Sequence, residues 1–179
     1  IVAVLSGESA SYLHVPFLWA GLIALIVPWP LVFFTWLPVQ TIYVVQLATF
    51  MLILLLTLPR RVRYALVPSS VKRERVHRRA VEQFLVQNLH TTAGRTGILI
   101  YVSVAERYAE IIADTGIDAK VEKGTWQAIV DDLTANISDG KAGDGFVHAV
   151  ERSGDLLATH FPPGTRDPNE LPNHLIIIE

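Results

Sequence analysis

Four carboxylates in the second half of the chain are its clearest candidates for chemistry. Glu106, Glu110, Asp114 and Asp118 follow one another at intervals of four residues. Hard cations such as Ca²⁺ and Mg²⁺ bind several oxygen ligands. The candidate metal ligands are Asp114, Glu106 and Asp118, with Asp114 first because it follows a predicted strand. The alternative is a solvated acidic rim, since no EF-hand pattern is present. We therefore expect no required cofactor, and Ca²⁺ or Mg²⁺ is the metal to test.

Phosphate chemistry would need cations together with a nucleophile or a metal-activated water. Arg95 and Arg107 could hold a phosphate, or they could anchor a turn and pair with Glu106. The chain has no Cys and no Asp-x-Asp sequence, and its six His are scattered rather than set at metal-binding spacing. We therefore assign no catalytic residue.

The charges divide the chain into three segments. Residues 1–59 carry one charged side chain, Glu8, whereas residues 60–79 carry a net charge of +7 and residues 80–179 a net charge of −8. This distribution excludes a plain soluble enzyme, a disordered chain and a nucleic-acid binder. We predict a transmembrane hairpin over 1–59, a basic juxtamembrane connector over 60–79 and a cytoplasmic domain over 80–179.

Two uncharged stretches, at about 12–34 and 37–58, predict the two membrane spans of the hairpin. Each is long enough to cross a hydrocarbon core of about 30 Å. Trp29 and Trp36 suit the aromatic belt at the membrane interface.

The first span contains residues that should shape it. Pro28 and a second proline two positions later would end the helix near Ile26 and leave an irregular continuation. The small residues Ala20, Gly21 and Ala24 are candidates for close packing between the helices.

Six cations of the connector are the candidate contacts to lipid head groups or to an acidic partner subunit: Arg60, Arg61, Arg63, Lys72, Arg73 and Arg75. A nucleic acid is not expected here, because the basic run directly follows a membrane span. By the positive-inside rule, these cations place the domain in the cytoplasm. A re-entrant first stretch, with the N-terminus on the far side, is the alternative.

Residues 69–90 predict a helix with an apolar stripe at Val81, Phe84 and Leu85.

The remaining residues predict a small α+β domain. Strands at 97–103 and 107–113 are separated by a short gap and should be antiparallel neighbours. Two helices follow, the first capped by Thr125 and the second spanning 142–160. Residues 175–178 are a candidate edge strand. The first of these helices has an apolar stripe at Trp126, Ile129, Val130, Leu133 and Ile137, and the second at Phe146, Val147, Val150 and Leu157.

The run from Gly94 to Ile117 resembles the core of the TPM domain family. Its motifs Arg95-Thr-Gly97, Glu106-Arg107 and Asp114-x-Gly116 occur in the family's order and spacing. Further resemblance to bacterial members lies at Trp126–Leu133, Gly145–Phe161 and Asn169-Glu-Leu-Pro172, so that it covers roughly residues 60–176. The resemblance implies an α/β/α sandwich. The functions that the resemblance implies differ among relatives. They are photosystem repair and assembly in thylakoids, acid phosphatase activity with a bound divalent cation, and modulation of a membrane receptor.

We expect a non-catalytic, membrane-anchored accessory subunit, or an assembly or maintenance factor, of a larger integral membrane complex. The family resemblance suggests a photosynthetic or respiratory complex. The expected location is the inner membrane of a bacterium, with two spans and the C-terminal domain in the cytoplasm. The expected partners are the lipid bilayer and that complex. The alternative is a membrane-anchored, divalent-metal-dependent acid phosphatase built around Asp114.

Overall fold

The computed structural model describes residues 1–8, 10–92, 94–162 and 175–178. The chain forms two compact units. The sandwich domain comprises Ile1–Ser9 and Arg73–Glu179, and the hairpin unit comprises Ala10–Lys72. The hairpin unit is therefore an insertion in the chain of the sandwich domain. The TPM-like stretch at Asn169-Glu-Leu-Pro172 lies outside the described residues.

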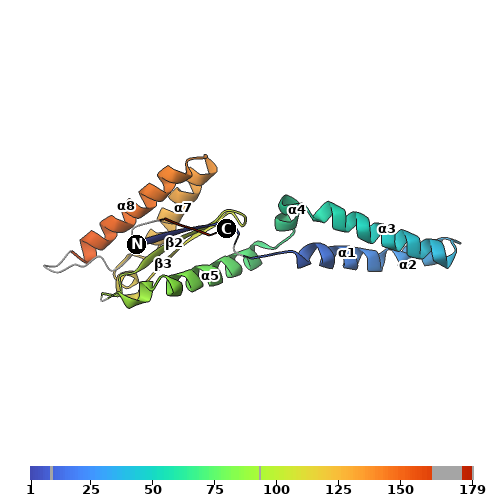
Figure 1. Ribbon diagram of the computed structural model, residues 1–179, viewed down its shortest axis with the longest axis horizontal. Helices are drawn as coiled ribbons and strands as arrows, with labels where there is room; N and C mark the ends of the chain where they lie inside the picture. Colours follow the sequence, from blue (N-terminus) through green and yellow to red (C-terminus); the bar gives the residue numbers. More distant parts are fainter. Residues whose placement is uncertain (9, 93, 163–174, 179) are drawn as a thin grey trace. The chain divides into compact units, whose positions relative to one another are not determined.

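A four-stranded mixed sheet forms the middle layer of the sandwich domain (Figure 1). Its strands are β1 (Val2–Ser6), β2 (Ile98–Ser103), β3 (Tyr108–Ala113) and β4 (Leu175–Ile178), in the spatial order β3-β2-β1-β4. β2 and β3 are antiparallel, whereas β1 is parallel to both β2 and β4. The predicted antiparallel pair and the predicted edge strand at 175–178 are both confirmed.

Strand β1 was not predicted from the sequence, although it is an inner strand of the sheet. Val2 lies opposite Leu99 of β2, and Ala3 lies opposite Leu175 of β4. Val2 and Val4 are buried on one face, and Ala3 and Leu5 pack on the other. An inner strand covered by helices on both faces is apolar along most of its length, as β1 is from Val2 to Leu5.

Helix α5 (Ser69–Val86) covers one face of the sheet. Its buried stripe is Val76, Ala80 and Phe84, at four-residue spacing, rather than the predicted Val81, Phe84 and Leu85. Val81 and Leu85 are instead exposed. The prediction failed because small Val and Ala side chains among cations carry a weak hydrophobic signal, while long cationic side chains can extend away from a buried stripe.

Helices α7 (Thr125–Ser138) and α8 (Ala142–His160) cover the other face of the sheet (Figure 1). The predicted stripe of α7 is confirmed, with Ile129 and Leu133 fully buried. Thr125 is not its cap, because Gly124 holds that position with a left-handed backbone. On α8, Ala149 is buried while Val147 and Val150 are exposed, so the predicted stripe was partly wrong. One helix layer on each face makes the domain an α/β/α sandwich, as expected.

The shorter elements join these layers. A 3₁₀ turn, η1 (Leu89–Thr91), follows α5, and a one-turn helix, α6 (Thr115–Asp118), follows β3.

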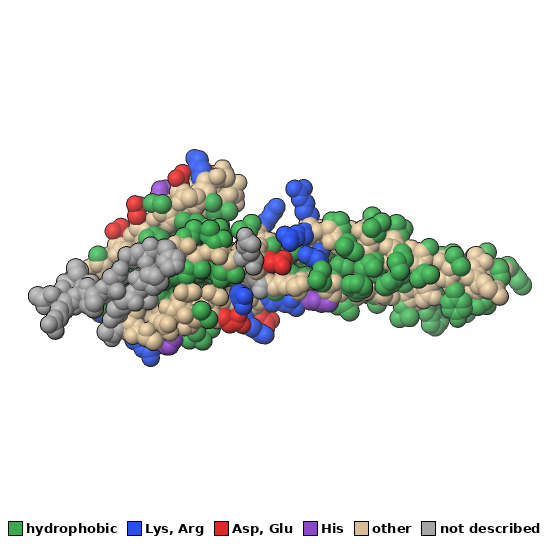
Figure 2. Space-filling model, viewed as in Figure 1, with side chains coloured by type: hydrophobic (Ala, Val, Ile, Leu, Met, Phe, Trp, Pro, Cys, Tyr) green, Lys and Arg blue, Asp and Glu red, His purple; other side chains and the backbone are tan. Residues whose placement is uncertain are grey.

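The hairpin unit contains two apolar helical segments, each long enough to cross a membrane. Its helices are α1 (His14–Ile26), α2 (Pro28–Phe34), α3 (Val39–Thr57) and α4 (Arg60–Ala65). The candidate spans are His14–Phe34, with 21 residues, and Val39–Thr57, with 19. Hydrophobic side chains cover the visible face of these helices (Figure 2). Only 11% and 6% of the two spans are buried, so most of their apolar side chains face outward.

The first span departs from expectation after Ile26. Val27 keeps helical backbone angles, and α2 continues the helix from Pro28. Because Pro is tolerated in the first turn of a helix, the expected irregular continuation was wrong. Ala20 and Ala24 are buried. A Cβ added at Gly21 would meet nothing within 4 Å, so Gly21 is not a packing position in the hairpin unit.

Candidate functional site

Asp114 lies at the C-terminal end of β3, where it caps α6. Its Oδ1 accepts a hydrogen bond from the backbone N–H of Thr115 at 2.7 Å. The side chain is only 6% exposed, and its Oδ2 is buried without a hydrogen-bond partner. A buried carboxylate oxygen with an open lone pair can accept a proton, a donor group or a cation. Asp114 shares this feature with Glu110, whose Oε2 is also buried without a hydrogen-bond partner.

Arg95 supplies positive charge to this corner of the domain. Its Nη1 lies 3.7 Å from Oδ2 of Asp114 and donates a hydrogen bond to the carbonyl of His90 at 3.2 Å. The Arg95 backbone has a φ of 53°, in the left-handed region. The guanidinium remains largely exposed, so the pair can also present a cation to a ligand.

Two glycines let the flanking loops approach this corner closely. A Cβ on Gly116 would lie 2.4 Å from the carbonyl oxygen of Gly94 and 2.5 Å from that of Arg95. A Cβ on Gly97 would lie 2.2 Å from the carbonyl oxygen of Leu89. The Arg95-Thr-Gly97 and Asp114-x-Gly116 motifs therefore interlock through backbone contacts that only Gly allows. We call this arrangement the glycine clasp.

Glu106 lies at the other end of the β2–β3 hairpin. It is buried in the turn, and Ser103 Oγ donates a short hydrogen bond to its Oε2. Arg107 and the six residues of β3 separate Glu106 from Asp114, and the strand alone spans about 20 Å. One metal ion cannot bind both side chains, so the structure does not assemble the predicted set of three ligands.

Asp118 has a different partner. It is exposed on α6, and its Oδ1 accepts a hydrogen bond from Trp126 Nε1 at 3.1 Å. The contact ties α6 to the start of α7. Within the described residues, no three His, Asp or Glu side chains are grouped so that they could hold a metal ion. The divalent cation implied by the resemblance therefore does not fit the donor groups around Asp114, where Arg95 already supplies positive charge.

The six connector cations are placed unequally. In the hairpin unit, Arg60 and Arg61 are exposed on α4, but Arg63 is only 7% exposed and lies 5.7 Å from the Tyr64 ring centre. Lys72 and Arg75 of α5 are half-buried, and Arg73 is exposed. Arg63 thus packs inside its own unit, whereas Arg60 and Arg61 are free to meet lipid phosphates or acidic side chains.

A groove that was not predicted from the sequence lies beside β3, one of the two edge strands of the described sheet. Its volume is about 600 Å³. The lining residues come from α5, the β2–β3 turn, β3 and α7: Arg73, Arg107, Tyr108, Ala109, Glu110, Ile111, Trp126, Gln127, Val130, Asp131 and Thr134. We call this the β3 groove. No local motif marks it, because it depends on which strand lies at the edge of the sheet.

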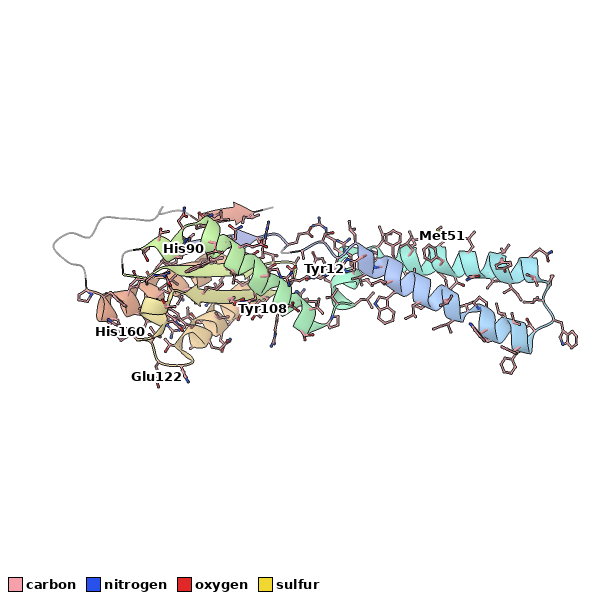
Figure 3. The ribbon with its side chains drawn as sticks, turned by 90° about the horizontal axis from the view of Figure 1, so that it is seen from below. Tyr12, Met51, His90, Tyr108, Glu122 and His160 are labelled. Atoms are coloured by element: carbon pink, nitrogen blue, oxygen red, sulfur yellow. The ribbon has the colours of Figure 1, made fainter. Side chains whose placement is uncertain are left out.

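Tyr108 is the groove residue whose pKa is shifted, and it lies beside α5 (Figure 3). Burial and the neighbouring Glu110 raise the pKa of Tyr108 above its ordinary value of 10.0, and Arg73 opposes the shift. The Tyr108 hydroxyl therefore stays protonated at neutral pH and can donate a hydrogen bond.

These features define a class of protein: an α/β/α sandwich domain whose chain carries a hairpin of two apolar helices long enough to cross a membrane. The family model of the TPM domain matches residues 60–156, and the chain belongs to the TPM domain family. No curated protein matches it. The chain is similar to the BA42 protein of the psychrophilic bacterium Bizionia argentinensis, whose structure was determined by NMR. The identity is 30% and the TM-score 0.52, over 57% of this chain and 70% of BA42.

Proposed function

We propose that the protein is a non-catalytic, membrane-anchored accessory subunit or assembly factor of a larger integral membrane complex. The observation that carries the proposal is the insertion of the hairpin unit between β1 and the rest of the sandwich domain. Both ends of the hairpin therefore lead into one folded domain. Two covalent links restrain that domain at the membrane more than a single anchor would, which suits a module that covers one face of a membrane complex.

The outer surface of the hairpin unit supports contacts within the membrane. Large apolar side chains are exposed along both spans, among them Leu22, Leu47 and Leu55. Exposed aromatic residues lie at the end of α2 and in the connecting turn, where Phe34 is 86% exposed and Trp36 is fully exposed. Such surfaces suit lipid or the apolar helices of a larger complex.

The sheet also bears on the number of membrane crossings. β1 and β2 are neighbouring strands, so the segments before and after the hairpin must lie on the same side of the membrane. Only an even number of crossings allows this. The arrangement favours two full spans over a re-entrant first segment. The exposed cations Arg60 and Arg61 then favour a cytoplasmic domain at the inner membrane.

The family resemblance directs the choice of complex. Thylakoid relatives that maintain photosystems favour a photosynthetic complex, and a respiratory complex is the counterpart in other bacteria. We assign Asp114 and Arg95 to the structure of the domain in this proposal, because together with the glycine clasp they hold α6 and the loop before β2 against each other.

The test is a pull-down of the full chain from native membranes in mild detergent, with the bound proteins identified. A stoichiometric membrane complex, retained by Asp114→Asn, supports the proposal. A chain that purifies alone, and that releases phosphate with Mg²⁺ or Ca²⁺ unless Asp114 is changed to Asn, contradicts it. That result would establish the phosphatase alternative.

A further inference from the structure

The β3 groove follows the open edge of the sheet rather than one of its faces. Residues 107–111 all line it, although successive side chains of a strand point to opposite faces. A pocket that contacts every residue in turn must lie alongside the strand. It is bordered by Arg73 of α5 on one side and by α7 on the other. The groove thus occupies the place that a further strand would take in the sandwich.

The length of the groove matches a short extended segment. The α7 residues that line it run from Trp126 to Thr134. Eight helical steps cover about 12 Å. Four residues of an added strand would cover about 13 Å.

Backbone groups along this edge are oriented for pairing. The N–H of Asp114 bonds to the carbonyl of Gly97 at 2.8 Å, on the β2 side. Orientation alternates along an antiparallel strand, so the N–H and C=O groups of Ala109 and Ile111 point away from β2. Because β3 is the edge of the described sheet, these groups face the groove.

The two walls of the groove differ in chemistry. Tyr108 and Glu110 share the α5 face with Arg73, and Arg107 lies at the end of the groove. Among the described residues, neither Arg73 nor Arg107 is in an ion pair. One oxygen of each acid is engaged: Glu110 Oε1 pairs with His77, and Asp131 Oδ1 accepts a hydrogen bond from Gln127, whereas Glu110 Oε2 is buried without a hydrogen-bond partner.

On the α7 side the groove is more apolar. Trp126, Val130 and Ile111 line it there. A strand that pairs with β3 would present alternate side chains to these two walls.

We propose that β3 binds an extended segment of a protein partner by strand addition, and that this segment alternates acidic with apolar side chains. Main-chain hydrogen bonds to Ala109 and Ile111 supply affinity, as in other complexes formed by strand addition. The acidic side chains meet Arg73 and Arg107, and the apolar ones meet Trp126 and Val130. The inference rests on the proposed function for the existence of a protein partner, but its test needs only this chain and a synthetic peptide.

The test titrates the isotope-labelled full chain, in detergent micelles, with a capped hexapeptide of alternating Val and Glu. We expect binding that shifts the amide signals of Ala109 and Ile111. Arg73→Glu should weaken binding by about two- to five-fold, the effect of losing one exposed ion pair. Arg152→Glu, an equally exposed change on α8, is the matched control and should leave binding unchanged.

Two further peptides test the proposal on the unchanged chain, so that the test does not depend on whether the Arg73→Glu variant folds. N-methylation at alternate residues removes the pairing N–H groups and should weaken binding by about tenfold. Replacement of Glu by Lys should weaken it as well. The proposal is overturned if either peptide binds as well as the parent, if no binding occurs up to millimolar concentration, or if the chain forms a dimer that the parent peptide does not dissociate. Failure here would leave the pull-down result unchanged.

Discussion

At the scale of single residues, the motifs shared with the TPM domain family have identifiable structural roles. Gly116 and Gly97 permit backbone contacts that any side chain would block, and Arg95 compensates the buried charge of Asp114. At the turn between β2 and β3, Ser103 Oγ donates a hydrogen bond to the buried carboxylate of Glu106. The pattern of these motifs is visible in the sequence. Their geometry is not, because it depends on loops that meet only after the sheet has formed.

Gly116→Ala should destabilise the sandwich domain by about 1–3 kcal/mol, the usual cost of overpacking a close contact. The added Cβ would press on two carbonyl oxygens, neither of which belongs to a flexible side chain. Gly143→Ala is the matched control, because a Cβ there meets nothing within 4 Å. Urea unfolding of the full chain in detergent, followed by circular dichroism, measures both. Equal stability of the two variants would refute the close contact at Gly116.

Tyr108 should make the stability of the domain sensitive to alkaline pH. Burial and Glu110 raise the pKa of Tyr108 in the folded state above its unfolded value of about 10. The folded state then holds the proton longer than the unfolded state. This contribution is complete below about pH 10 and is lost as the pH rises through the folded pKa.

Tyr108→Phe should therefore flatten the decline in unfolding free energy at alkaline pH. Arg73→Gln should steepen it, because Arg73 is the group that lowers the pKa of Tyr108. Urea unfolding at a series of alkaline pH values gives the slopes. A Tyr108→Phe variant with the parent slope would show that Tyr108 does not contribute.

At the scale of secondary structure, helices and strands with local signals were predictable, and β1 was not. The bounds of α8 were predicted closely, and β2 and β3 were placed correctly. β1 pairs with β2 from a distant part of the chain, and no turn or motif links the two strands. Its apolar residues also precede a long apolar hairpin, which conceals them. The β3 groove was missed for a related reason, because sheet order follows from non-local pairing.

Removal of residues 1–7 should release β4 from the sheet. Within the described sheet β4 pairs with β1, so its backbone hydrogen bonds depend on that strand. Hydrogen exchange at residues 175–178 should then become fast, while exchange in β2 rises less because β3 still pairs with it. Ile177→Ala is the control, since the Ile177 side chain is 68% exposed. Persistent protection of β4 in the shortened chain would contradict the strand order.

At the scale of the whole molecule, the chain has a discontinuous sandwich domain and a continuous hairpin unit. The sandwich domain uses residues from both sides of the hairpin unit. A protein partner that binds the β3 groove would thus bind a domain that is linked to the hairpin unit at two points of the chain. The number of times that the hairpin unit crosses the membrane can be tested through these two links.

Single cysteines should report the number of crossings, because the chain has no Cys of its own. We expect Leu37→Cys, in the turn of the hairpin, to react with an impermeant maleimide added outside intact cells. Gly7→Cys and Asp139→Cys, in the two chain segments of the sandwich domain, should react only after the cells are permeabilised. Labelling of Gly7→Cys from outside, while Asp139→Cys reacts only after permeabilisation, would contradict two crossings and would be incompatible with the pairing of β1 with β2. Labelling of both cysteines from outside would instead contradict the cytoplasmic location of the domain.

The position of β1 also sets an order of events during synthesis. β1 leaves the ribosome before its partner strand β2, which lies almost a hundred residues later in the chain, as the pairing of Val2 with Leu99 shows. At about 5–20 residues per second, β1 waits several seconds or more, while both apolar helices are made. If the hairpin unit crosses the membrane once instead of twice, β1 and β2 lie on opposite sides of the membrane. The sheet then lacks its inner strand β1. If the proposed two-span topology holds, the sheet can be completed only after both spans have inserted, and a chain inserted with one span would keep an incomplete sheet.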